Sequence, residues 1–304
     1  MVDVAPPSRA FVLGLADREG HLDGAALYEL GESIGFTDTT IRLTVRRLVE
    51  AGLIESSGRG RSSTLQLTPA GVQERAPDLG WTALAYRLDS TAPPWDGRWH
   101  LVAFEIPEAE RAGRDALRAH LIDLFGAPLG GGLYVSARDW EPWIDELVTI
   151  HEIGRYVTTI VTDRLRVAGE TGARSIAASL WPVDEVGVGA RGFVSTWEPL
   201  VSDPPPGLGD AARAAFSASL EFEALARRDP LLPRELEPPD WAGRAARRVY
   251  RDLLDALGSA HDAIANANVF AAFVAAVDET SSMTDGEFGQ WLWRSTRPRS
   301  AVRG

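Results

Sequence analysis

Apolar residues at helical spacing predict two helices within the first 35 residues of the chain. The first covers residues 8–17 and the second residues 24–34. In each segment the apolar positions fall on one side of a helix with 3.6 residues per turn. Gly35 then supplies a turn. The inward-facing positions are Phe11, Val12, Leu15, Leu27, Leu30 and Ile34.

A third helix is marked at both of its ends. Thr37 is a favourable N-cap, and Asp38 follows in the first turn, where the helix dipole favours a negative charge. Gly52 stands where a left-handed residue ends a helix. Residues 53–55 and residues 63–68, in which Thr64, Leu65, Gln66 and Leu67 alternate, then predict two strands joined by a tight turn. The predicted apolar face of this helix consists of Ile41, Val45, Leu48 and Val49.

The opposite face of the third helix is polar and basic. A helix followed by a hairpin with a basic turn is typical of the second half of a winged helix-turn-helix, which presents one helix face to the major groove of DNA. The alternative is an ordinary amphipathic helix with solvated arginines, followed by an ordinary hairpin. The candidate DNA-contacting residues on the helix and in the turn are Thr39, Thr40, Arg42, Leu43, Arg46, Arg47, Arg59 and Arg61.

A different pattern begins at Trp99, after a predicted helix at 70–86 and a linker that is rich in polar residues and proline. It predicts strands at 99–106, 132–136 and 156–162, with amphipathic helices between them at 111–125 and 140–150. This order of strands and helices resembles a ferredoxin-like α+β fold.

Beyond residue 173 the pattern is mostly helical, with proline-rich breaks at 202–207 and 229–241. We therefore expect an α+β protein with an N-terminal winged helix-turn-helix, a ferredoxin-like centre and a helical C-terminal domain. The expected divisions are residues 1–86, a linker at 87–98, the central domain at 99–172, the helical domain at 173–280 and a flexible tail at 281–304.

Composition limits the chemistry that this chain of 304 residues can perform. It contains no cysteine and no lysine, so all 31 basic residues are arginine. Thiolate metal sites, Schiff-base catalysis and a phosphate-binding loop that ends in Gly-Lys are therefore excluded. The net charge is −12, but the segment 37–61 has five arginines against three acidic residues. A small local DNA-binding surface fits this distribution better than a wholly basic protein does.

The chain has no run of 18 apolar residues and no signal-peptide core, so we expect a cytoplasmic protein with no membrane partner.

Several longer motifs resemble the PaaX family of repressors of phenylacetic-acid degradation. They are DGRWHLVAFEIPEAERAGRDALRAHL, GGLYVSARDW, ASLWPVDEV and RRDPLLPRELEPPDWAGRAARRVY, within a resemblance that covers roughly residues 8–260. The resemblance implies a homodimeric transcriptional repressor that binds a palindromic DNA operator and is released by an aryl-acyl-CoA thioester such as phenylacetyl-CoA. It also implies a central domain similar to the ferredoxin-like fold of CRISPR-associated nucleases, without their activity.

One aromatic residue beside three arginines suggests where such an effector would bind. Trp241, Arg244, Arg247 and Arg248 offer an aromatic surface for an aryl group and guanidinium groups for CoA phosphates. The alternative is the start of a helix with a solvated basic face. No cofactor is expected.

Two other classes of function remain open from the sequence. One is a metal-dependent nuclease built on the central domain, with Asp139 or Glu105 as a metal ligand, and the other is a winged-helix adaptor that binds proteins. The five histidines have no metal-ligand spacing among themselves, so we expect neither a metal site nor an enzyme. They are His21, His100, His120, His151 and His261.

Overall fold

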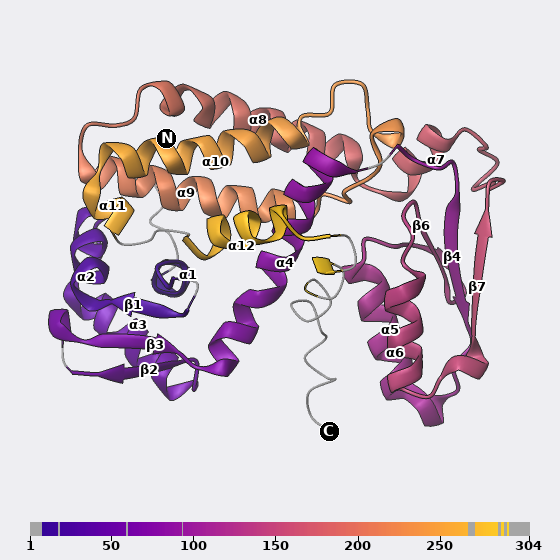
Figure 1. Cartoon of the computed structure of the whole chain (residues 1–304), viewed down its shortest axis with the longest axis horizontal. Helices are drawn as coiled ribbons and strands as arrows, with labels where there is room; N and C mark the ends of the chain where they lie inside the picture. The colour runs from indigo at the N-terminus through magenta and orange to yellow at the C-terminus, as the bar shows by residue number, and fades with distance from the viewer. Residues whose placement is uncertain are drawn as a thin grey trace. The chain divides into compact units, whose positions relative to one another are not determined.

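The computed structural model describes residues 8–17, 19–58, 60–92, 94–266, 271–284, 287–288 and 291. The chain forms two compact units (Figure 1). The first unit draws on Met1–Asp89, Val188–Arg227 and Ala242–Thr296, and the second on Ser90–Gly187, Arg228–Trp241 and Arg297–Gly304. Helices combine with two antiparallel sheets, so the α+β class is confirmed. Among the described residues, no helix is both long and apolar enough to cross a membrane.

The first unit begins with three helices and a small sheet. The strands pair antiparallel in the order β1-β3-β2, with Leu22 opposite Leu65 and Ile54 opposite Leu67. The short strand β1 was not predicted, because three residues are too few to show an alternating pattern. The elements are α1 (Ser8–Gly14), β1 (His21–Asp23), α2 (Gly24–Ser33), α3 (Asp38–Glu50), β2 (Ile54–Ser57), the 3-10 turn Gly60–Ser62 and β3 (Thr64–Leu67).

Helix α3 begins at the predicted position but turns a slightly different face to the core. The Thr37 hydroxyl accepts a hydrogen bond from the backbone N–H of Thr40 at 3.1 Å, so the predicted N-cap is confirmed. Val49 was predicted to be buried and is 39% exposed, whereas Thr44 is buried. The reason is tertiary, because the Thr44 hydroxyl donates to Ser8 Oγ at 2.8 Å, which directs this side of α3 toward α1.

Helix α4 spans Pro69–Thr91 and is longer than predicted. The helix therefore continues through the first five residues of the segment 87–98, which we expected to be a linker. Long-range contacts stabilise this end of the helix. The Arg87 guanidinium donates to the Thr280 carbonyl at 2.9 Å, and Asp89 accepts hydrogen bonds from Arg247.

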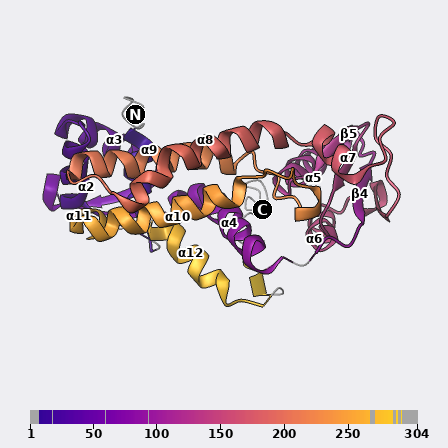
Figure 2. The same cartoon turned by 90° about the horizontal axis from the view of Figure 1, so that it is seen from above.

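The remaining helices of the first unit share a core with the N-terminal elements. From Val188 onward α8 lies beside α9 and α10 in both views (Figures 1 and 2). The rings of Phe11 and Phe216 lie 4.8 Å apart, and those of Phe222 and Tyr250 stack at 4.1 Å. Segments expected to belong to separate domains thus contribute to one hydrophobic cluster. The helices are α8 (Val183–Ser202), α9 (Leu208–Ala226), α10 (Gly243–Ala260), α11 (Asp262–Asn266) and α12 (Ala271–Ser281).

The second unit is built on a four-stranded antiparallel sheet with the order β5-β6-β4-β7. Strand β5 was missed from the sequence, because it is short and contains Pro128 and an irregular register. The elements are β4 (Trp99–Phe104), the 3-10 turn Glu108–Glu110, α5 (Arg111–Asp123), β5 (Ala127–Gly130), β6 (Leu133–Ser136), α6 (Glu141–Ile150), the 3-10 turn Gly154–Tyr156, β7 (Val157–Thr162), α7 (Ala173–Leu180) and the 3-10 turn Arg234–Leu236.

The two faces of this sheet are covered by different elements. Trp99 and Leu101 share a buried cluster with residues of α7 and with Trp181, whose ring stacks on Trp99 at 6.4 Å. The alternate residues of β4 face the other side, where α5 and α6 lie (Figure 1). Arg118 of α5 donates to the Tyr134 hydroxyl at 3.1 Å on this side. The sheet therefore holds His100, also an alternate residue of β4, beneath the start of α6.

Candidate nucleic-acid interface and a histidine–carboxylate cluster

The outer face of α3 presents the predicted basic residues to solvent. Thr39, Arg42, Arg46 and Arg47 are exposed, and Thr40 and Leu43 are half-buried. Ile41 and Leu48 are each only 1% exposed and fix the rotation of the helix. Because these two residues anchor the inner face, the arginines are held on the opposite side.

Among the residues that the structure describes, few contacts restrain these arginines. Arg46 pairs with Glu50 of the next turn at 3.3 Å, and both side chains are 64% exposed. An exposed pair of this kind contributes little to stability and gives way easily to another anion. Thr40 is different, because its backbone N–H and its hydroxyl both interact with the Thr37 hydroxyl at the helix cap. Thr40 therefore helps to form the helix start.

Of the two arginines in the hairpin turn, Arg59 and Arg61, the structure describes only Arg61. Arg59 lies outside the described residues. Arg61 does not project freely, because its Nη2 lies 2.9 Å from Glu32 Oε2 and 3.7 Å from Asp38 Oδ1. The hydrogen bond with Glu32 raises the pKa of Arg61 above its ordinary value. Arg61 thus links the turn to α2 and to the start of α3.

The four candidate effector residues have different surroundings. Arg247 is buried and pairs with Asp89, to which Arg244 Nε also lies close at 3.5 Å. Arg248 is exposed and lies 3.9 Å from Glu198. Trp241 belongs to the second unit, where it packs against a cluster that includes Leu232 and Leu236. The three arginines belong to the first unit, so their grouping with Trp241 stays a prediction.

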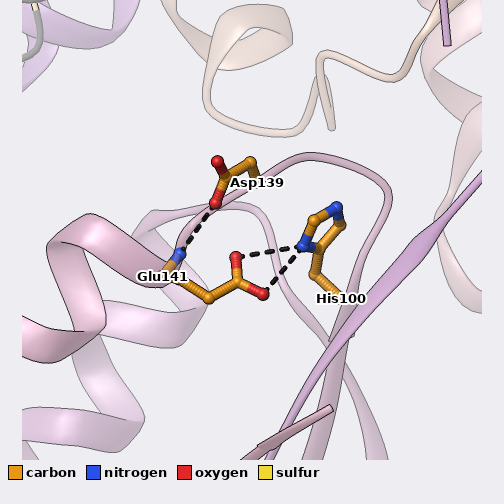
Figure 3. Close-up of side chains that lie close together, drawn as sticks. All are labelled: His100, Asp139 and Glu141. Atoms are coloured by element: carbon orange, nitrogen blue, oxygen red, sulfur yellow. Dashed lines mark hydrogen bonds and ion pairs between the residues drawn. The ribbon is translucent and has the colours of Figure 1, made fainter. Parts of the chain in front are cut away.

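A cluster that the sequence did not indicate lies at the start of α6 (Figure 3). His100 Nδ1 is 2.8 Å from Glu141 Oε1 and 3.0 Å from Glu141 Oε2. The backbone N–H of Glu141 donates to Asp139 Oδ1 at 3.2 Å, and that of Trp140 donates to Glu141 Oε2 at 3.1 Å. One imidazole and two carboxylates are thereby brought to the edge of the second unit.

The two carboxyl groups have opposite shifts of pKa. Interaction with the Glu141 carboxyl, followed by burial, raises the pKa of Asp139. Burial alone would raise the pKa of Glu141, but the hydrogen bonds with Asp139 and His100 outweigh it, and the pKa of Glu141 is lowered. Of the two carboxyl groups, that of Asp139 therefore retains a proton more readily.

Sequence reasoning named Asp139 but missed its neighbours. His100 lies about 40 positions earlier in the chain, so no short spacing signals the contact. Glu105 was the other suggested metal ligand, and it is exposed just beyond the opposite end of β4. The nuclease alternative stays a prediction.

His120 is fully buried on α5. Burial lowers the pKa of its imidazole to about 4, so the ring is neutral at pH 7.

Comparisons with known proteins agree with the motifs of the chain. Residues 92–176 match the model of the PaaX protein central Cas2-like domain, and residues 181–267 match that of the PaaX-like protein C-terminal domain. The transcriptional repressor PaaX of Escherichia coli (strain K12) is 29% identical over 248 residues, which cover 77% of this chain and 74% of that protein. A solved structure, the uncharacterized protein Rv0674 from Mycobacterium tuberculosis, has a similar fold with a TM-score of 0.58 and 20% identity, and the match covers 85% of this chain and 98% of that one. Two consecutive family domains and a repressor that matches over most of its length lead to one conclusion: the chain belongs to the PaaX family of transcriptional regulators.

Proposed function

We propose that this protein is a transcriptional repressor that binds an operator through a winged helix-turn-helix in its N-terminal segment. In this proposal α2 and α3 form the helix-turn-helix and the β2–β3 hairpin forms the wing. The observation that carries it is the exposed basic face of α3, held outward by the buried Ile41 and Leu48. A helix anchored in this way can enter the major groove without disturbing the core.

The side chains on this face divide into two roles by their chemistry. Arg42 and Arg46 would read base edges, because a guanidinium can donate two parallel hydrogen bonds to guanine. Thr39 and Leu43 would line the same contact. Arg47 on the flank, with Arg59 and Arg61 in the turn, would contact phosphates and set the register of the helix on the duplex.

Arg61 would exchange partners on binding. Its ion pairs with Glu32 and Asp38 are exposed and therefore weak. A DNA phosphate carries one negative charge, as each carboxylate does, and its contact with Arg61 also releases counterions from the DNA, which favours the exchange. The acidic neighbours would then limit non-specific binding, because they compete with every phosphate for Arg61.

We further propose that the protein acts in the cytoplasm as a homodimer on an inverted repeat. Two recognition helices of a dimer would lie about 34 Å apart, one turn of the duplex. The central domain would have the ferredoxin-like arrangement, which the strand order β5-β6-β4-β7 with α5 and α6 on one face supports. In this proposal the segments 1–86, 99–172 and 173–280 keep separate roles, although the first and the last share one hydrophobic cluster.

The effector would be an aryl-acyl-CoA thioester such as phenylacetyl-CoA. Trp241 would contact the aryl group, and Arg244, Arg247 and Arg248 would contact the CoA phosphates. Arg248 is the arginine best placed for this by its exposure. Arg247 would have to loosen its pair with Asp89 to contribute. Trp241→Ala should then abolish release by the effector while DNA affinity is unchanged, and release that is unaffected would remove Trp241 from the site.

The experiment is a titration of the full chain against fragments of the DNA upstream of its own gene, at several salt concentrations, with and without phenylacetyl-CoA. We expect tight binding to one fragment, a steep loss of affinity with salt, and release by the thioester. DNA binding that is unchanged by the thioester would contradict the proposed effector but not the proposed repressor function. Absence of binding to every fragment would contradict the repressor itself and favour the adaptor alternative.

A further inference from the structure

We propose that His100, Asp139 and Glu141 form a binding site for one divalent transition-metal ion, with zinc as the expected occupant. This site lies within the second unit and does not depend on the DNA-binding proposal. It brings together a residue of β4, a residue of the loop before α6 and the first residue of α6 (Figure 3).

The three side chains are already close enough to share an ion. One possible ligand atom from each residue lies within 4.8 Å of the others. Ligand atoms around zinc lie about 2 Å from the metal, and hence at most about 4 Å from one another. Asp139 is the ligand that would move to complete the set, because its side chain is exposed and the other two groups are already in contact at 2.8 Å.

Two of the ligands are held in place by the fold. The His100 side chain is 10% exposed on a central strand, and the Glu141 side chain is 23% exposed at the helix start. The backbone N–H of Trp140 orients the Glu141 carboxylate. A site that is largely formed before binding loses little conformational entropy when the ion arrives.

The hydrogen-bonding pattern has room for a cation in place of a proton. His100 Nδ1 faces both oxygens of Glu141, and only one proton joins these groups. A metal ion can take the place of that proton, since metal binding requires a neutral imidazole and ionised carboxylates and releases the protons they held. The cation also neutralises the negative charges that Asp139 and Glu141 bring to the cluster.

The donor set selects the class of ion. One imidazole nitrogen and two carboxylate oxygens suit zinc or manganese, whereas magnesium and calcium prefer oxygen ligands alone. The chain has no cysteine, so a thiolate-bound zinc cannot compete within the same molecule. Three protein ligands leave at least one position for water.

The test is calorimetric titration of the chelator-treated full chain with Zn²⁺, Mn²⁺ and Mg²⁺ as separate probes. We expect one equivalent of Zn²⁺ per chain, weaker Mn²⁺ binding and no Mg²⁺ binding at the same concentrations. Asp139→Asn should weaken Zn²⁺ binding by about tenfold or more, and His100→Gln should do the same. The matched control is Asp145→Asn, which changes an exposed carboxylate on α6, the helix that begins at Glu141. This variant should bind Zn²⁺ as the unaltered chain does.

Asp139 is exposed, so its variant tests the site even if His100→Gln fails to fold. Circular dichroism of each variant checks the fold. Titration with Co²⁺ adds a spectroscopic readout, because visible absorption bands report nitrogen and oxygen ligands and should be lost in Asp139→Asn. The proposal is overturned if the unaltered chain binds no stoichiometric Zn²⁺, or if Asp139→Asn binds it with unchanged affinity.

Discussion

Arg247 and Asp89 form a two-pronged ion pair that joins α10 to the end of α4. Arg247 Nε lies 2.6 Å from Asp89 Oδ2, and Nη2 lies 2.7 Å from Oδ1. The two side chains are 7% and 21% exposed. The Tyr86 hydroxyl donates to the backbone carbonyl of Arg247 at 2.5 Å and adds a second link between the same helices. These contacts explain why α4 continues to Thr91.

Removing one member of this pair should destabilise the first unit. Asp89→Asn leaves a buried guanidinium without its compensating charge, which we expect to lower the free energy of unfolding by about 3 kcal/mol. Urea denaturation followed by circular dichroism measures the change. Arg248 lies on α10 beside Arg247, and Arg248→Met breaks its exposed pair with Glu198 of α8, which should cost about 0.5 kcal/mol or less. Equal losses in the two variants would contradict a structural role for the Arg247–Asp89 pair.

Arg42 and Arg47 should have different effects on DNA recognition. Arg42→Ala should remove about 1–3 kcal/mol of discrimination at one base position, because it lies on the proposed reading face. Arg47→Ala should weaken binding to all sequences alike and reduce the slope of log affinity against log salt by about 1. Affinities for a set of operator variants at several salt concentrations provide both readouts. The reverse pattern would exchange the roles assigned to the two arginines.

Glu32→Gln should strengthen DNA binding at low salt. The substitution removes the main partner of Arg61 and frees its guanidinium for a phosphate. Glu29→Gln is the matched control, because it removes one negative charge from the same helix at a residue that influences Arg61 only through its charge. Binding measured at low and high salt should improve more for Glu32→Gln than for Glu29→Gln. Equal gains would indicate a general charge effect without release of Arg61.

His120 should make the second unit sensitive to acid. Its pKa is about 4 in the folded protein and about 6.5 when unfolded, so the neutral ring stabilises the fold above pH 6.5. As the pH falls from about 6.5 to 4 the unfolded state binds the proton first, and up to about 3 kcal/mol of stability is lost. His120→Leu should remove this part of the pH dependence.

Denaturation of the second unit at pH 7 and pH 5 tests the role of His120. His21→Gln serves as the control, because His21 is exposed in the first unit. Identical losses between pH 7 and pH 5 for the unaltered chain and His120→Leu would assign the acid sensitivity to other groups.

Much of the order of elements was predictable because its signals are local. The cap at Thr37 and the spacing of Ile41 and Leu48 lie within one helix, so they mark α3 without knowledge of the rest of the chain. The nearly continuous apolar run from Trp99 to Phe104 marked β4 in the same way. Strand β5 could not be predicted in this way. It has four residues, one of them a proline, and so shows no alternation of apolar and polar residues.

In the candidate sites, too, some features follow from local spacing in the sequence and others from contacts between distant segments. The exposed arginines of α3 follow from one helical period, and the sequence therefore determined which of them share a face. The partners of a side chain depend on segments that are distant in sequence. The contact of Thr44 with Ser8, the pairing of Arg61 with Glu32 and the meeting of His100 with Glu141 span from 29 to 41 positions. Only the tertiary structure decided these contacts, because local periodicity describes a residue's neighbours within a turn or a strand and contains no information on which distant segment will pack against it.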